Sequence, residues 1–135
     1  MGDLLELRLF NDLKNEIDSS KNHILSLKDN WDGEGSKGFK EETLKKAIIF
    51  LKGLAEQFFN NSGLVMQTPS ILPVGDLSID IHWRTEKMEL TINFSEECID
   101  KPSFYGVDKD GNEIQGIMSI EKIYSVILPW LEEFH

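Results

Sequence analysis

Hydrophobic residues recur every three or four positions along two stretches in the first half of the chain. This spacing predicts amphipathic helices over residues 3–28 and 41–60, because side chains three and four apart share one helical face. The polar run Asp18-Ser19-Ser20 allows a bend or a break in the first helix, since these residue types have low helix propensity. The connection is short, so the two helices should form an antiparallel hairpin.

The pattern changes to alternation after residue 69. Pro69 and Pro73 restrict residues 70–72 to a short edge strand, because proline donates no hydrogen bond to a neighbouring strand. Four alternating runs then predict two β-hairpins, the first with one apolar face and the second with an Asp-Gly turn. The runs are residues 77–83, 88–94, 103–107 and 113–117.

A third helical pattern closes the chain. Ser119 stands where a side chain caps a helix, and Pro129 should kink or split that helix. Strands joined by short loops pair antiparallel, and 135 residues suit one domain. We therefore predict a single α+β domain over residues 1–135. It is a two-layer sandwich with an N-terminal helical hairpin, an antiparallel sheet of four to five strands and a C-terminal helix.

Charge and composition limit the cellular environments and the partners that we expect for the protein. The formal net charge of -10 repels phosphate backbones, so direct binding to nucleic acid is not expected. No apolar run approaches the roughly 20 residues that a membrane helix needs, and we expect no membrane contact. The acidic N-terminus lacks the basic start of a secretory signal, and the lone Cys98 suits a reducing compartment. These features together predict a cytoplasmic protein.

A polar loop with one large aromatic residue separates the first two predicted helices. Its sequence is Asn30-Trp31-Asp32-Gly33-Glu34-Gly35-Ser36. The glycines permit positive φ, so the loop can reverse the chain while Trp31 plugs the end of the core. Alternatively, Trp31 points outward and anchors a partner protein, since tryptophan within a polar rim is a common hot-spot composition. The candidate binding residues here are Trp31, Asp32, Gly33, Glu34 and Gly35.

The same loop partly matches a calcium-binding loop. Asn30, Asp32 and Glu34 fall at the first, third and fifth ligand positions, and Glu41 falls at the last. The ninth position is a glycine, which has no side chain to donate. A Ca²⁺ or Mn²⁺ site over residues 30–41 is therefore the less favoured interpretation. The segment 108–113 also imitates an oxygen-ligand loop, but its Asp-Gly turn favours a plain hairpin.

Three residues of the first predicted hairpin complete the candidate binding set: Asp80, His82 and Trp83. Asp80 and His82 lie on its polar face, where His82 should approach Glu89 or Thr91 across the hairpin. A histidine beside a carboxylate can act as an acid–base pair, yet a solvated strand histidine is the simpler interpretation. The other histidines are far apart in sequence, so no catalytic set can be assembled. Phosphate-binding loops are absent, and no cofactor is expected.

Several of these segments resemble a pattern in small uncharacterised bacterial proteins. The shared features are the Trp31-Asp32-Gly33-Glu34-Gly35 turn after a helix, the Pro69-x-Ile71-x-Pro73 segment and a strand that ends in Trp83. Some proteins of that group look like passengers of mobile elements or phage. The resemblance implies a helix-hairpin architecture and assigns no activity.

The acidic charge and the lack of a catalytic set favour a protein-interaction module. We expect an inhibitor, antitoxin, immunity or anti-defence protein that binds a basic partner protein, because opposite charges steer association. Apolar residues on several sides of the first helical turns also allow a homodimer through that helix. They are Leu4, Leu5, Leu7 and Leu9. The alternative class is a metal-dependent enzyme or regulatory domain that uses residues 30–41.

Overall fold

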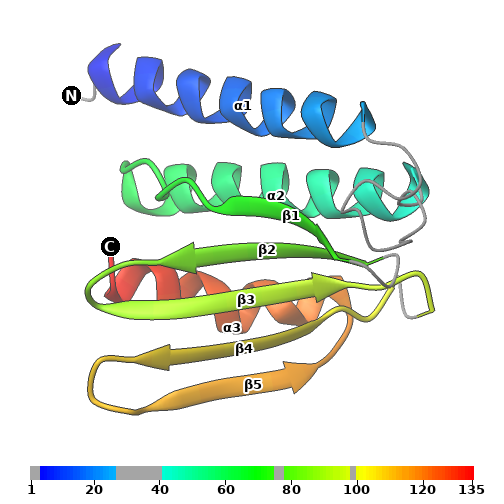
Figure 1. The fold of residues 1–135 in the computed structure, drawn as a ribbon. Coiled ribbons are helices and arrows are strands. Elements are labelled where there is room, and N and C mark those ends of the chain that lie inside the picture. The colour runs from blue at the N-terminus through cyan, green and yellow to red at the C-terminus, as the bar shows by residue number, and fades with distance from the viewer. Residues whose placement is uncertain (1–3, 27–40, 75–77, 98–99) are drawn as a thin grey trace.

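The computed structural model describes residues 4–26, 41–74, 78–97 and 100–135. The helices are α1 (Leu4–Leu25), α2 (Glu41–Ser62) and α3 (Ile120–Glu133). The strands are β1 (Ser70–Val74), β2 (Ser78–Arg84), β3 (Met88–Phe94), β4 (Ser103–Asp108) and β5 (Glu113–Ile117). Helices α1 and α2 lie antiparallel, and the strands form one sheet (Figure 1). The predicted α+β architecture is confirmed.

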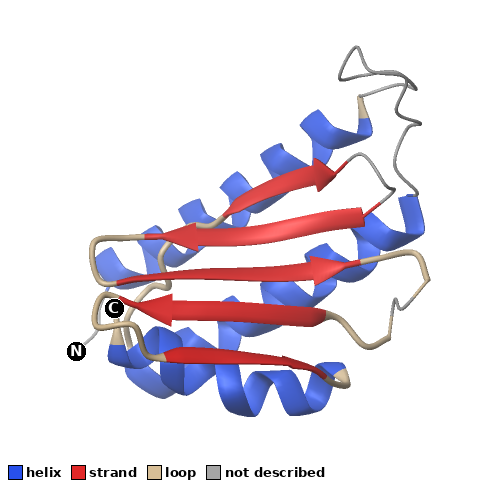
Figure 2. Ribbon diagram, turned by 60° about the horizontal axis from the view of Figure 1, so that its bottom comes forward, coloured by secondary structure: helices blue, strands red, loops and turns tan. Residues whose placement is uncertain are grey.

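The sheet is a meander in which each strand pairs antiparallel with the next. Its order is β1-β2-β3-β4-β5, so β1 and β5 are the edge strands. The helices all lie on one side of the sheet, and the other side is open (Figure 2). This arrangement explains the alternation along the strands, because every second residue must face either the helices or solvent.

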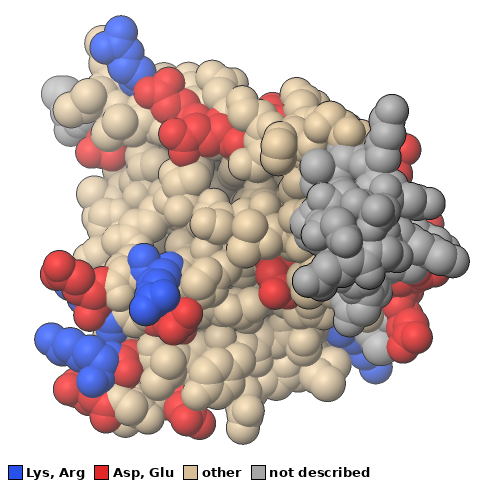
Figure 3. Space-filling view, in the orientation of Figure 1, with Lys and Arg blue, Asp and Glu red and all other residues tan. Residues whose placement is uncertain are grey.

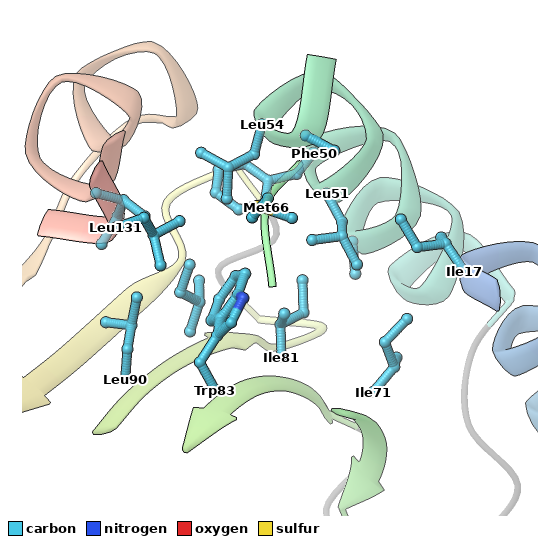
Figure 4. Close-up of a cluster of buried hydrophobic side chains, with 14 of the residues drawn as sticks. Ile17, Phe50, Leu51, Leu54, Met66, Ile71, Ile81, Trp83, Leu90 and Leu131 are labelled. Carbon is cyan, nitrogen blue, oxygen red and sulfur yellow. The ribbon is translucent and has the colours of Figure 1, made fainter. Parts of the chain in front are cut away.

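The core fills the space between the sheet and the helices. Its residues from the central strands include Ile81, Trp83 and Leu90, which are all fully buried. Figure 4 shows the Trp83 ring among side chains of α2 and α3, including Leu54 and Leu131. The Trp83 indole N–H donates to the backbone carbonyl of Gln67 at 2.9 Å, which ties the segment before β1 to β2. Burial of this apolar layer is the main source of stability.

Helix α1 is continuous through Asp18-Ser19-Ser20, so the break that the sequence allowed there does not occur. Ile17 and Ile24 bury their side chains on either side of this run. The Asp18 carboxylate also lies 2.7 Å from the Lys52 ammonium of α2, and this hydrogen bond holds the pKa of Asp18 below its ordinary value. Packing and pairing against α2 therefore outweigh the weak local propensity.

The helix ends differ in how closely they follow the sequence. Helix α2 ends at Ser62, two residues beyond the predicted end, where Gly63 adopts a φ of 73° and its N–H bonds to the Phe59 carbonyl at 2.8 Å. Ser119 occupies the N-cap position of α3, but its side chain makes no capping bond. Helix α3 is not split at Pro129 and runs on to Glu133. No helix in the described ranges has both the length and the hydrophobicity needed to cross a bilayer.

A close approach between α2 and α3 gives a test of the packing. The Tyr124 hydroxyl donates to the Phe50 carbonyl at 3.0 Å, and a Cβ added at Gly53 would lie 2.6 Å from that hydroxyl oxygen. Gly53→Ala should therefore destabilise the protein, although alanine normally gains ~1 kcal/mol over glycine inside a helix. In a Tyr124→Phe background the same change should instead stabilise it by roughly 0.5–1 kcal/mol. Urea unfolding of the four proteins gives the change in unfolding free energy that Gly53→Ala causes in each background. A change of the same sign in both backgrounds would contradict this packing.

Candidate functional site

The open face of the sheet carries three rows of side chains that run across the strands. Each row follows directly from the pairing register. The first, called the apolar-ended row, is Leu72, Asp80, Asn93, Ser103 and Ile117. The second, called the tyrosine row, is Ser70, His82, Thr91, Tyr105 and Gln115. The third, called the charged row, is Arg84, Glu89, Val107 and Glu113, and it lies nearest the hairpin turns.

Charged side chains are unevenly spread over this face. In Figure 3, which has the orientation of Figure 1, they gather toward the hairpin end of the strands and the borders, while uncharged residues cover most of the middle. Hydrophobic residues mark both edges: Leu72 of β1 is 49% exposed and Ile117 of β5 is 69% exposed. The face is therefore neither a plain solvated surface nor a continuous apolar patch.

Asp80 is held by a side chain of the next strand. The Asn93 amide donates to the Asp80 carboxylate at 2.6 Å and to the Ser78 hydroxyl at 3.2 Å. Asp80 and Asn93 are direct partners in the register of β2 and β3, so their side chains emerge side by side. One carboxylate oxygen of Asp80 is thereby oriented by a neutral donor.

His82 contacts Glu89 across the same hairpin, as the sequence led us to expect. The imidazole Nε2 lies 2.8 Å from a Glu89 carboxylate oxygen, and Thr91 is the direct register partner of His82. The pair is geometrically capable of acid–base chemistry. The cavity that Asn93, Ser103 and Ile117 line does not include His82 or Glu89.

Tyr105 and Glu113 form the third contact on this face. The Tyr105 hydroxyl donates to a Glu113 carboxylate oxygen at 3.0 Å, and 44% of the Tyr105 residue surface is exposed. This hydrogen bond is the main cause that raises the pKa of Tyr105, and the negative charges of Glu113 and Glu89 raise it further. Both effects favour the neutral phenol, because ionisation would place a third negative charge beside two carboxylates.

This geometry predicts a specific titration result. Glu113→Gln should lower the pKa of Tyr105 toward its ordinary value, since it removes both the ionised acceptor and its charge. The protein has one other tyrosine, Tyr124, whose raised pKa comes first from burial and should not change. Ring resonances followed by NMR against pH report both groups in one sample. An unchanged Tyr105 midpoint would show that the contact is absent in solution.

The candidate residues from the sequence are only partly brought together. Asp80 and His82 share the open face, but Trp83 faces the opposite way and is 1% exposed, which removes it from any surface site in this structure. Strand alternation separates them, because adjacent residues point to opposite faces. The loop residues Trp31, Asp32, Gly33, Glu34 and Gly35 lie outside the described residues, so their role stays a prediction.

Metal binding receives no support from the described part of the chain. No group of three or more His, Cys, Asp or Glu side chains there could hold an ion. In the hairpin turn after β4, Asp108 accepts bonds from the backbone N–H groups of Asp110 and Asn112 at 2.8 and 2.9 Å. Its carboxylate thus stabilises the turn itself. The bond from the Asn112 side-chain amide lowers the pKa of Asp108 most, and the bonds from the backbone N–H groups lower it further. The proposed cation loop over residues 30–41 is described only at Glu41.

Several residues of the open face were not singled out from the sequence. They are Asn93, Tyr105, Glu113 and Ile117. The signal that could have found them is the predicted alternation itself: aligning the two hairpins around their turns places Tyr105 and Glu113 on the polar face. Comparison of the chain with protein-family models, with curated proteins and with solved structures gives no match.

Proposed function

We propose that the protein is a small acidic interaction module that binds a basic partner protein through the open face of its sheet. The observation that carries the proposal is the state of three carboxylates: Asp80, Glu89 and Glu113. Each is oriented by a neighbouring side chain, and none forms an ion pair with a lysine or arginine among the described residues. Oriented carboxylates that have no lysine or arginine partner in the described ranges favour a cationic partner, because the ordering entropy is already lost before binding.

The distribution of the other side chains supports the same interpretation. Leu72 and Ile117 place exposed hydrophobic surface at the two edges of the sheet, and Tyr105 adds an exposed aromatic ring between them. Aromatic and aliphatic anchors within a polar surround are typical of protein–protein interfaces. The formal charge of -10 extends the attraction for a basic protein to roughly a Debye length, about 8–10 Å at ordinary ionic strength.

The biological class that fits is a cytoplasmic inhibitor, antitoxin, immunity or anti-defence protein. Such proteins act by covering a target, so they need a rigid binding face rather than a catalytic cavity. The resemblance of the helical turn and first hairpin to proteins of mobile elements is in keeping with this role. Arg84, which is the register partner of Glu89, offsets part of the negative charge and would help to set the orientation of the partner.

A pair of charge-matched variants tests the proposal. The face variant carries Asp80→Asn, Glu89→Gln and Glu113→Gln, and the helix variant carries Glu42→Gln, Glu56→Gln and Glu133→Gln at exposed positions of α2 and α3. Both lose three negative charges from the same formal total of -10, so only their location differs. The proteins are tagged and used to capture partners from cells of the source organism.

The face variant should lose at least about 30-fold in affinity for the captured basic protein, which corresponds to one or two hot-spot residues. The helix variant should retain it within a few-fold. Equal loss of affinity in both variants would mean that only the net charge matters, and it would contradict a dedicated binding face. Capture of no basic protein by the wild-type chain would contradict the proposed function as a whole.

A further inference from the structure

Tyr105 occupies a particular position between two of the three carboxylates. Glu89 on β3 and Glu113 on β5 both belong to the charged row, and Val107 of β4 is the register partner of each. Tyr105 is the neighbouring residue of β4 on the same face, so Glu89 and Glu113 stand diagonally to it, one on each side. The Glu113 carboxylate accepts the Tyr105 hydroxyl bond, while the Glu89 carboxylate lies 2.8 Å from His82 Nε2 on the side of β2. The strands that carry the two carboxylates are two strand spacings apart, about 10 Å.

The exposed ring and the flanking carboxylates are complementary to one kind of group, a planar cation. An aromatic face attracts a cation that lies over it, and arginine is the commoner partner because its planar guanidinium stacks on the ring. The edges of a stacked guanidinium keep free N–H donors, which carboxylates on both sides can accept. A lysine ammonium offers the same charge but neither the stacking surface nor the two-sided donor geometry.

We propose that Tyr105, Glu89 and Glu113 form the subsite that receives an arginine side chain of the partner protein. This inference rests on the proposed function and adds the chemical group that the open face recognises. Charge complementarity supports it: the negative charges of both carboxylates act on the Tyr105 hydroxyl, and neither carboxylate forms an ion pair with a lysine or arginine of the described chain, although Arg84 stands opposite Glu89 in the register. Val107 gives the subsite an apolar floor against which the methylene stem of an arginine can lie.

A peptide titration tests the subsite without knowledge of the partner. The probes are the blocked peptides acetyl-Gly-Arg-Gly-amide and acetyl-Gly-Lys-Gly-amide, and the readout is the NMR spectrum of the protein. The arginine peptide should shift the Tyr105 ring and the amides of residues 89, 107 and 113 in a saturable way, with a Kd on the order of millimolar for so small a ligand. The lysine peptide should bind at the same place at least three-fold more weakly.

Two variants and one control complete the experiment. Tyr105→Leu keeps an apolar side chain at this exposed position but removes the ring, and Glu113→Gln keeps the size but removes the charge. Each should weaken arginine binding at least three-fold, whereas Glu56→Gln on α2 should leave it unchanged. The signals of Tyr124, which is packed against Phe50, report whether each variant is still folded.

The outcomes separate this inference from the proposed function. Absence of saturable shifts at Tyr105, or shifts centred on the helices, would overturn the arginine subsite. Capture with the charge-matched variants would then still test whether the open face binds the partner protein. Equal affinity for the lysine peptide would overturn the assignment to arginine. If the peptide binds as expected but no basic protein is captured, the subsite stands and the inhibitor role is wrong.

Discussion

Replacement of Trp83 by alanine should destabilise the native state by about 3–5 kcal/mol, the usual cost of deleting a large buried aromatic side chain. Trp83 is fully buried at the centre of the layer between the sheet and the helices. Its removal leaves a cavity lined by side chains of several elements, which cannot all collapse into it. The Gln67 carbonyl also loses its 2.9 Å bond to the indole N–H, which adds the cost of an unsatisfied acceptor.

Two further variants separate these contributions. Trp83→Phe keeps most of the packing but removes the N–H donor, so it should cost less than Trp83→Ala. Ile49→Ala truncates a residue that is 67% exposed on α2 and should change stability by no more than about 0.5 kcal/mol. Urea unfolding at fixed pH measures all three. A loss below about 1 kcal/mol for Trp83→Ala would mean that the tryptophan is not packed as the structure places it.

Gly106→Val should also destabilise the protein, by about 1–3 kcal/mol, because it overfills the core side of β4. A Cβ added at Gly106 would lie 3.0 Å from Cγ1 of Ile114 and 3.1 Å from Cδ1 of Leu90. These two residues are the register partners of Gly106 on β5 and β3, and their side chains fill the space above it. The glycine is therefore required by close packing rather than by its backbone conformation.

A double-mutant cycle tests this explanation. Ile114→Ala removes the nearest of the two side chains, so Gly106→Ala should cost clearly less in the Ile114→Ala background than in the wild type. The coupling is measured from the unfolding free energies of the four proteins. Additive effects would show that Ile114 does not occupy the space next to Gly106.

Most of the secondary structure could be predicted from the sequence, because the spacing of the hydrophobic residues and the positions of the turn-forming residues agreed along most of the chain. Alternation located β2 to β5, and Asp-Gly chemistry located the turn in which Gly111 adopts a φ of 86°. The low helix propensity of Asp18-Ser19-Ser20 suggested a break in α1, but contacts with α2 keep the helix intact. Those contacts join residues distant in sequence, and propensity does not contain them.

The candidate site was harder to predict for the same reason. Asp80 and His82 could be placed on the polar face from alternation, and Glu89 was an expected neighbour of His82. The pairing of β4 with β3 and β5 was needed to bring Tyr105 between Glu89 and Glu113. Trp83 was one of the candidate binding residues of the first hairpin, yet in this chain it belongs to the core.

The helix surface offers the main competing location for a partner. Leu4 at the start of α1 is 87% exposed, and self-association through this helix stays a prediction. The helices and the open sheet face lie on opposite sides of the sheet, so one measurement can distinguish them (Figure 2).

That measurement is the methyl NMR spectrum of the protein with and without the captured basic partner. Binding through the open face should shift the methyl signals of Leu72, Val107 and Ile117 and leave those of Leu4 and Ile49 unchanged. Shifts confined to Leu4 and Ile49, with no change on the sheet, would contradict the open face as the binding surface.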